Sequence, residues 1–572
     1  MTTVEHQKFK VVDLFAGAGG LSYGFFKDPD FEIVWANEYD KGIAKIYQDN
    51  HPGIPMIVDG IENLTEELLK EFDIEQIDLV IGGPPCQSYS TVGKRQMDDR
   101  ANLYQEYIRM LQLLKPKAFI YENVKGLLSM EKGQLIKDIK KGFEELGYEV
   151  TQQLMNAADY GVPQTRERVI LVGVLGKNNF IYPAPTHSEK PELFELLAHV
   201  TLEDAIGNLP SIKSNQSAEA YIDAPKTDYQ KFIQDTTILT NHSTPQNGDN
   251  LIAIMEALPD GGTKDDLPEE IRPSSGYGNT YSKLWWHRPA TTITRNFSTP
   301  SSSRCIHPRD SRPLTAREGA RLQSFPDSYQ FKGTKNTVNL SIGNAVPPLL
   351  STVLTPHIKE VLIHMTIPKE LLKLDTELRK HYTQYLADQG VTYPTIGNKR
   401  WYVLMCLFEH YQQAISQDDI TNWFAKYEQN YDRQARHLAA DGWYISSGNI
   451  RSTRMLVENG LNRTDLKLVD ITQPNPIWKK ERQTARDYHL TENDWNEKLE
   501  LFRKKRGCSV CGRHVEHYDK GHLDPTKPLE DNNIVPMCVE CNNWGQVRDA
   551  VFVLEEDTLI ARPVEFRRQP KK

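Results

Sequence analysis

The chain has 572 residues, 39% of them hydrophobic and 25% charged, as in soluble globular proteins, and this length predicts roughly three or four domains. No apolar run is long enough to span a bilayer, and the N-terminal MTTVEHQKFK lacks a signal-peptide core. We therefore expect a cytoplasmic protein without a membrane partner. The net charge of −9 excludes a chain coated with basic residues, although a local basic patch could still bind nucleic acid.

The first 175 residues alternate apolar strands with amphipathic helical stretches. The expected strands are Phe9–Phe15, Phe31–Asn37, Ile77–Ile81, Ala118–Tyr121 and Arg168–Val174. The expected helices are Asp40–Asn50, Asn63–Phe72, Asp99–Leu114 and Leu135–Leu146. This alternation predicts an α/β fold in which a parallel sheet carries helices on both faces.

A glycine-rich loop, DLFAGAGG (13–20), follows the first strand and opens a helix. Glycines let a backbone approach a ligand closely at the carboxyl edge of such a sheet. The second strand ends in Glu38, whose carboxylate could accept hydrogen bonds from both ribose hydroxyls, and Asp59 could reach an adenine amino group. The combination favours an adenosine cofactor over a structural turn.

A second loop, GGPPCQSYS (82–90), ends an apolar strand and places Cys86 at the bend. Two prolines fix φ there and remove two backbone donors, which makes the loop stiff. Structural cysteines usually occupy apolar surroundings, as we expect for Cys305 and Cys406. An exposed thiol held at a set position indicates a chemical role for Cys86.

The alternation of strands and helices stops at about residue 176, and short strands and turns are expected from there to about residue 290. Helical character returns from Pro313 to about Ile363. A junction is expected near Thr366–Lys373. Three helices are then expected, at Trp401–Tyr411, Ile420–Tyr427 and Asp432–Asp441. With the apolar residues after them, they resemble a winged helix-turn-helix whose third helix enters the major groove, or they form a small helical spacer.

Six motifs occur in the order found in DNA (cytosine-5)-methyltransferases. They are DLFAGAGG, GGPPCQS, Glu122–Val124, Gln164–Arg168, the block Arg312–Asp327 and Ile342–Pro348. Over residues 9 to 360 the chain therefore resembles this family. The resemblance implies a Rossmann-like methyltransferase domain (1–175 and 313–365) that uses S-adenosylmethionine, a small irregular target-recognition domain (176–312), and double-stranded DNA as the partner.

The resemblance also implies roles for individual residues. Cys86 would add as a thiolate to C6 of a flipped cytosine, so that C5 becomes electron-rich enough to take a methyl group. Glu122 would hold and protonate N3, Arg168 would contact O2, and Arg166 would orient the site. The residues implied to line the cofactor pocket are Phe15, Ala16, Gly17, Gly19, Gly20, Glu38, Asp59, Pro84 and Asn344. At Asn344, a simple turn is the alternative.

Two Cys-x-x-Cys pairs lie near the C-terminal end, and their spacing is that of a closed structural zinc site. The four cysteines are Cys508, Cys511, Cys538 and Cys541. With the polar residues around them they resemble HNH nucleases of the ββα-metal type. The resemblance implies that His522 activates water, that Asn533 braces the hairpin loop, and that Asp519 and Asn542 hold Mg²⁺ or Mn²⁺.

The match to the nuclease motif is incomplete. Many such nucleases have the acidic metal ligand directly before the histidine, where this chain has Gly521. Asp519 is the nearest candidate and Asp524 the second. A zinc ribbon that only binds DNA is therefore the alternative for this region.

Taken together, the motifs predict a prokaryotic fused restriction–modification protein with a helical DNA-binding domain (366–480) and an HNH nuclease domain (481–572). The alternatives are a methyltransferase with a non-catalytic zinc module, and a fusion that nicks DNA or cuts methylated DNA. One ββα-metal site cuts one strand, so a double-strand break would need a homodimer or two successive events.

Overall fold

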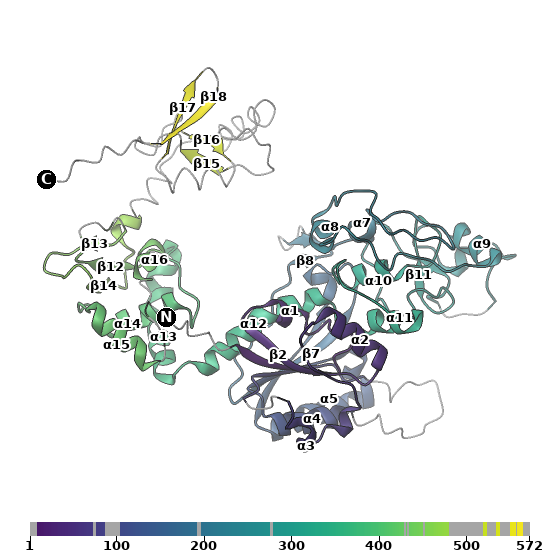
Figure 1. The fold of residues 1–572 in the computed structure, drawn as a ribbon, viewed down its shortest axis with the longest axis horizontal. Coiled ribbons are helices and arrows are strands. Elements are labelled where there is room, and N and C mark those ends of the chain that lie inside the picture. The colour runs from purple at the N-terminus through teal and green to yellow at the C-terminus, as the bar shows by residue number, and fades with distance from the viewer. Residues whose placement is uncertain are drawn as a thin grey trace. The chain divides into compact units, whose positions relative to one another are not determined.

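The chain forms two compact units, Met1–Thr366 and Ile367–Lys572 (Figure 1). The computed structural model describes residues 8–72, 76–85, 103–191, 196–274, 278–427, 429, 431, 434–449, 452 and 454–479, and the strands 519–522, 534–537, 550–555 and 558–563. None of the helices in these ranges combines the length and the apolar character needed to cross a bilayer.

The N-terminal unit is built on a seven-stranded sheet with the order β3-β2-β1-β4-β5-β7-β6 (Figure 1). Its strands are β1 (Phe9–Leu14), β2 (Phe31–Asn37), β3 (Met56–Ile57), β4 (Leu79–Gly82), β5 (Ala118–Val124), β6 (Tyr148–Asn156) and β7 (Glu167–Leu175). The strands from β1 to β5 are parallel, but β7 is antiparallel to both of its neighbours.

The expectation of a parallel sheet is therefore wrong at one edge, where β6 had also not been predicted. Only residues 157–166 connect β6 to β7, and a parallel connection needs a dozen or more residues. The antiparallel direction brings the amino end of β7 to the edge where the parallel strands have their carboxyl ends.

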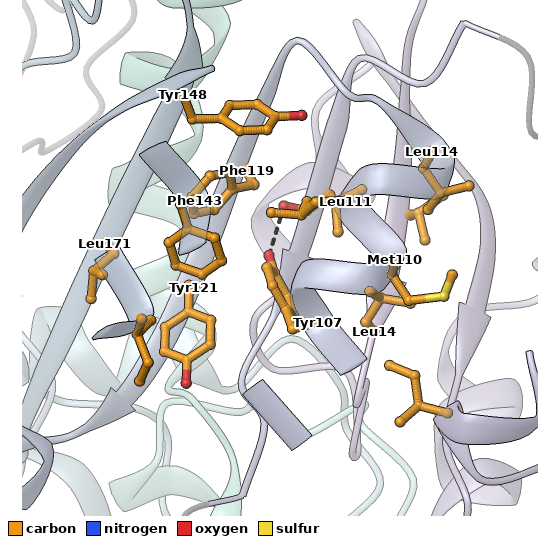
Figure 2. Packing of buried hydrophobic residues seen from close by; sticks show 14 of the residues in the cluster. Leu14, Tyr107, Met110, Leu111, Leu114, Phe119, Tyr121, Phe143, Tyr148 and Leu171 are labelled. Atoms are coloured by element: carbon orange, nitrogen blue, oxygen red, sulfur yellow. Dashed lines mark hydrogen bonds between the residues drawn. The ribbon is translucent and has the colours of Figure 1, made fainter. Parts of the chain in front are cut away.

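Alternate residues of the strands face two separate cores. Val12 and Leu14 pack with α4 (Leu103–Leu114) and α5 (Gln134–Glu145), and Figure 2 shows the aromatic centre of this cluster. There the Tyr107 hydroxyl donates to the Ile120 carbonyl over 2.8 Å. Val11 faces the other core, whose helices are α1 (Tyr23–Lys27) and α12 (Pro348–Thr366). The remaining helical segments around the sheet are α2 (Lys41–Asn50), η1 (Ile61–Asn63), α3 (Glu66–Leu69), η4 (Lys125–Leu128), η5 (Met130–Gly133) and η6 (Ala157–Tyr160).

Residues 342–351 return to the loop after β1. The Gly24 amide donates to Ser351 Oγ, 327 positions further along the chain. A Cβ at Gly20 would lie 2.0 Å from the Val346 carbonyl oxygen. The chain can therefore close over this loop only because position 20 has no side chain.

The segment from 176 to 312 is irregular, as expected. Its elements, with the helices that follow it, are β8 (His187–Ser188), β9 (Leu197–Ala198), α7 (Leu202–Ile206), α8 (Asp228–Ile233), α9 (Asp249–Ala257), η7 (Lys264–Asp266), β10 (Ser282–Lys283), β11 (Arg304–Ile306), α10 (Ala316–Leu322) and α11 (Lys335–Asn344). Buried arginines attach this segment to α10: Arg317 and Arg321 belong to that helix, and Arg312 pairs with its Glu318. Arg321 donates to the Ala205 carbonyl, Arg312 to that of Ile212, and Arg317 to that of Thr240.

The C-terminal unit begins with helices. They are α13 (Lys369–His381), η8 (Tyr382–Leu386), η9 (Ala387–Gln389), α14 (Lys399–Glu409), α15 (Gln417–Lys426) and α16 (Ala435–Ala440). The boundary between the two units, at Thr366, lies in the expected junction Thr366–Lys373, within which α13 already begins at Lys369. Asp375 explains why this segment is ordered, because its buried carboxylate accepts hydrogen bonds from the Trp401 indole and the Tyr393 hydroxyl.

Strands follow the helices of the C-terminal unit. A three-stranded sheet, β13-β12-β14, contains β12 (Tyr444–Ser447), β13 (Leu456–Val457) and β14 (Leu466–Asp470). Further along, β15 (Asp519–His522) pairs antiparallel with β16 (Ile534–Met537), and β17 (Ala550–Glu555) with β18 (Thr558–Pro563).

The close approach at Gly20 predicts a stability effect. Gly20→Ala should destabilise the N-terminal unit by about 1–3 kcal/mol, because the Val346 backbone must move to admit the methyl group. Gly278→Ala is the matched control, since a Cβ there meets no atom within 4 Å in the part of the chain that the structure describes. Thermal unfolding followed by circular dichroism measures both, and equal melting of the two variants would contradict the packing argument.

Candidate active site

The carboxyl ends of β1 to β5 and the amino end of β7 meet at one edge of the sheet, where open α/β folds bind ligands. The predicted methyltransferase residues before residue 176 follow or end these strands. Cys86 lies outside the described residues, directly after Pro85. The loops on either side of it can still be described.

The glycine-rich loop has an unusual backbone. Phe15, Gly17 and Gly19 have φ values of 53°, 56° and 84°, in the left-handed region that favours glycine. A Cβ at Gly19 would lie 2.2 Å from Cε1 of His51, whereas one at Gly17 would meet no atom of the described residues within 4 Å. The loop is therefore packed against His51 at Gly19, and the described residues leave space beside Gly17, as a close-fitting ligand requires. Ala16 is buried and its amide donates to the Asn37 carbonyl.

Glu38 connects the end of β2 to this loop. Its carboxylate accepts hydrogen bonds of 3.0 Å from the Gly17 amide and from the Asp40 amide. Burial raises the pKa of Glu38, and these two amides act in the opposite direction. Each carboxylate oxygen can accept more than one hydrogen bond, so Glu38 retains acceptor capacity for a ligand.

Asp59 lies beside Glu38 across the sheet edge. The Asn37 side chain donates to the carbonyls of Ile57 and Asp59, over 3.1 and 2.9 Å, and so fixes the segment after β3. The Asp59 side chain is exposed. Hydrogen bonds from Asn63 and from the Gly60 amide lower the pKa of Asp59, which keeps it an anionic acceptor.

Two residues at this edge were not predicted. Tyr39 follows Glu38 and its side chain is 68% exposed, so an aromatic ring is available where a purine would lie. Asp13 is buried, and its Oδ2 has no hydrogen-bond partner among the described residues. Burial raises the pKa of Asp13 to about 7. An aromatic residue directly after the acid expected to bind ribose was a usable signal for Tyr39, whereas no sequence pattern indicates the environment of Asp13.

Glu122 and Arg168 form an ion pair, with 2.8 Å between Oε1 and Nε. The register of β5 and β7 brings them together, because Glu122 lies opposite Ile170 and Arg168 opposite Val124. Both side chains are about nine-tenths buried. The pair thus presents a carboxyl and a forked cation side by side, which suits the amidine-like edge of cytosine.

The loop leading to Cys86 is fixed to the same strand as Glu122. Asn123 Nδ2 donates to the carbonyl of the buried Pro84 over 3.1 Å. A Cβ at Gly83 would lie 2.6 Å from Oε2 of Glu122, so the loop starts in contact with the carboxylate. The position of Cys86 is thereby limited to within a few residues' reach of Glu122.

Arg166 holds several segments together. Its guanidinium is buried and donates to the carbonyls of Ile293, Gly343 and Ala345, at 2.8, 3.1 and 2.8 Å. Burial lowers the pKa of Arg166. Asn344, at the exposed end of α11, lies between two of these carbonyls. Arg166 is therefore a positioning residue and does not itself contact a base.

Gln164 extends this network. Its side-chain oxygen accepts from the Ile293 amide, and its nitrogen donates to the Leu322 carbonyl and the Gln323 side chain. Gln164 had been seen only as part of a motif. Gln164 is buried where it contacts Ile293 of the 176–312 segment. It therefore supports the site from the protein interior, by holding that segment in place.

Most predicted nuclease residues fall outside the described part of the chain. Asp519 and His522 are the two ends of β15, where the register places them opposite Met537 and Ile534. The four cysteines, Asn533 and Asn542 are not described. Within the described ranges, no cluster of three or more His, Cys, Asp or Glu side chains is arranged to hold a metal ion.

Residues 9–360 match the C-5 cytosine-specific DNA methylase family. The chain belongs to this family. It is 33% identical to the type II methyltransferase M.AgeI of Thalassovita gelatinovora, over 61% of this chain and 99% of that protein. It is 36% identical to the type II methyltransferase M.FnuDI of Fusobacterium nucleatum, over 62% and 95%.

The fold of this methylase is also found in solved structures. A structure described as an E. coli prophage-encoded DNA modification methyltransferase is 25% identical, with a TM-score of 0.50, and covers 62% of this chain and 99% of that one. Family membership implies S-adenosylmethionine as methyl donor and DNA as substrate. The open loop at Gly17, the acceptors Glu38 and Asp59 and the exposed Tyr39 ring fit an adenosine-containing donor.

The Glu122–Arg168 pair predicts a separation between chemistry and cofactor binding. Glu122→Gln should lower kcat by about 10²–10⁴-fold, because an amide cannot pass a proton to N3. Binding of S-adenosylmethionine should be unchanged, because Glu38 and Asp59 lie on other strands. Tritiated methyl transfer and calorimetry measure the two effects.

Glu167→Gln is the matched control for this experiment. Glu167 forms an exposed ion pair with Lys125, and such pairs contribute little, so its kcat should change by less than about fivefold. A Glu122→Gln variant with kcat like that of this control would show that Glu122 has no part in the chemistry.

Proposed function

We propose that this methylase transfers a methyl group to C5 of a cytosine turned out of double-stranded DNA, through a transient bond between Cys86 and C6. The observation that carries the proposal is the buried Glu122–Arg168 ion pair in contact with the loop that precedes Cys86. A carboxyl, a guanidinium and a nearby thiol form the set that activation of a pyrimidine ring requires.

The chain's residues act in sequence. The Cys86 thiolate forms an S–C6 bond while Glu122, starting as a protonated carboxyl, donates its proton to N3 and becomes the carboxylate paired with Arg168, and the ring's electron density moves to C5. Arg168 holds O2 and keeps the Glu122 carboxyl in place. S-adenosylmethionine, when bound, supplies an electrophilic methyl group. Once C5 carries the methyl group, a base removes the C5 proton, the S–C6 bond breaks, and the proton on N3 is returned.

The covalent step can be trapped. With S-adenosylmethionine supplied, DNA in which 5-fluorocytosine replaces cytosine should form an adduct that survives denaturing gel electrophoresis, because the methylated C5 then carries fluorine in place of the proton whose removal lets the S–C6 bond break. Cys86→Ser should form no adduct and show no methyl transfer, while Cys305→Ser, at a buried cysteine, should behave like the wild type. An adduct with the Cys86→Ser variant would disprove the mechanism.

We further propose that the C-terminal part is a zinc-stapled HNH nuclease, so that the chain is a fused restriction–modification protein. The observation that favours it is the antiparallel pairing of β15 with β16, because a ββα-metal site starts with such a hairpin. His522 ends the first strand, and Cys538 follows the second. Four thiolates at this spacing suit Zn²⁺. Asn542 and an acidic residue, with Asp519 the nearest candidate, would hold Mg²⁺ or Mn²⁺ beside His522, the base that would activate water.

A cleavage assay tests the fusion. The wild type should cut unmodified DNA with Mg²⁺ or Mn²⁺ and should spare DNA that it has already methylated. His522→Ala should lose cleavage and keep methylation, and Cys86→Ser should show the reverse pattern. Absence of cutting by the wild type would support a non-catalytic zinc module, and equal cutting of methylated DNA would remove the role in self-protection.

A further inference from the structure

Arg109 connects α4 to the segment that follows β3. Its Nη1 donates to the Leu64 carbonyl over 2.8 Å, and its Nη2 donates to the Ile61 carbonyl over 2.7 Å. Ile61 begins η1, and Leu64 directly follows it. A guanidinium is a rigid fork, so it can bind two carbonyls at a fixed spacing, which a lysine ammonium cannot do. One side chain of α4 therefore holds both ends of η1.

The orientation of Arg109 is itself fixed. Glu106, three residues earlier on α4, accepts a hydrogen bond from Arg109 Nε over 2.7 Å. The side chains of Arg109 and Glu106 are 36% and 26% exposed, so this ion pair is partly shielded from solvent. Ile61 and Leu64 are buried in the same core cluster as Met110 of α4. The guanidinium thus bonds to a backbone that is packed against its own helix.

The segment held by Arg109 presents the Asp59 carboxylate. Asn63, the last residue of η1, donates from Nδ2 to Asp59 Oδ1 over 2.9 Å, and the Gly60 amide donates to the same oxygen over 2.7 Å. Both bonds end at Oδ1, so Oδ2 keeps acceptor capacity for a ligand. A displacement of η1 would move Asn63 and change the direction in which the carboxylate points.

A different contact holds the other end of this segment. The Asn37 side chain, at the end of β2, donates to the Asp59 carbonyl over 2.9 Å. Asn37 therefore fixes the main chain at position 59, whereas Arg109 fixes η1 beyond it. The Asp59 side chain is exposed, so these polar contacts, and not packing in a core, determine its orientation.

We propose that Arg109 is a positioning residue that sets the preference of the cofactor pocket for adenine, because it holds η1 and, through Asn63, the Asp59 carboxylate. The inference deepens the proposed function, since it rests on S-adenosylmethionine as the methyl donor and on Asp59 as the acceptor for the adenine amino group. It adds to that site a residue of α4, a helix that lies outside the six motifs.

The test compares two ligands that differ at the adenine amino group. S-adenosylhomocysteine, the donor without its methyl group, carries this amino group, and S-inosylhomocysteine carries an oxygen in its place. Calorimetry on the full-length chain without DNA gives the Kd of each, and the preference is the Kd of the inosyl compound divided by that of the adenosyl compound. Arg109→Gln should lower the wild-type preference by about 3- to 10-fold, because a displaced carboxylate loses a charge-assisted hydrogen bond.

Further variants make the result specific. Arg109→Lys keeps the charge but not the fork, and Asn63→Ala removes the contact with Asp59, so both should also lower the preference. Lys137→Gln is the matched control, since it removes one positive charge from an exposed position on α5, and it should keep the wild-type preference. In the Asp59→Asn background, Arg109→Gln should have no additional effect on the preference, because the two changes act on one contact.

Methyl-transfer kinetics give a second readout. Arg109→Gln should raise the KM for S-adenosylmethionine and leave kcat within about twofold of the wild type at saturating donor and DNA. The reason is that Glu122 and Arg168 are held by β5 and β7, away from η1. A general loosening of the fold would instead lower kcat as well.

The proposal fails if the Arg109 variants weaken both ligands equally, if they leave the preference unchanged, or if Arg109→Lys keeps the wild-type preference. If Arg109→Gln melts at a lower temperature, Arg109→Lys and Asn63→Ala decide the question. An Asp59→Asn variant with the wild-type preference would remove the acceptor role on which the proposal rests. If the preference responds as expected but no adduct forms with 5-fluorocytosine DNA, the proposed methylation is refuted and the role of Arg109 stands.

Discussion

The buried guanidinium of Arg166 joins the parts of the methyltransferase site. A charge removed from water must be compensated by hydrogen bonds, and here the carbonyls of Ile293, Gly343 and Ala345 provide them. Those three carbonyls belong to the end of the recognition segment and to the segment beside the cofactor loop. The same short stretch continues to Arg168, which holds Glu122. In the proposed function, target docking, cofactor binding and base chemistry would therefore share one structural support.

The two carboxylates of the site are held by different means, which keeps their tasks apart. Backbone amides fix Glu38 and orient it toward the glycine-rich loop. A neighbouring arginine fixes Glu122 and leaves it in contact with the loop that carries the thiol. An acceptor for hydroxyls needs only a stable position, whereas a group that exchanges a proton needs a partner that can stabilise its charge. The architecture meets both needs at one sheet edge.

Much of this could be predicted from the sequence, because period-two apolar runs identify strands and short motifs mark the ends of those strands. The bounds of β2 agree with the expectation, and those of β1, β4, β5 and β7 agree to within a few residues. The direction of β7 was harder to predict from the sequence, since it depends on how residues 157–166 connect β6 to β7. The motif that contains Arg166 likewise could not show that its guanidinium is buried among carbonyl groups, because those carbonyls lie far along the chain.

The helix at 369–381 shows a related limit. The expected junction, Thr366–Lys373, does contain the unit boundary, but it does not indicate a helix from Lys369. The contacts of Asp375 with Trp401 and Tyr393 join residues that no local pattern relates. For Cys86, the zinc cysteines, Asn533 and Asn542 the expectations remain those of the sequence, as these positions lie outside the described residues.

In the proposed fusion, DNA is the common substrate of both units. A site that must turn out one cytosine needs sequence readout, which falls to the segment at 176–312 in the proposed mechanism. A second module that bound the same duplex would then do so at high effective concentration, because it belongs to the same chain, and such linkage can raise avidity by roughly 10²–10⁴-fold. Under that condition the second module would need little affinity of its own, since it would act on DNA that the first had already selected.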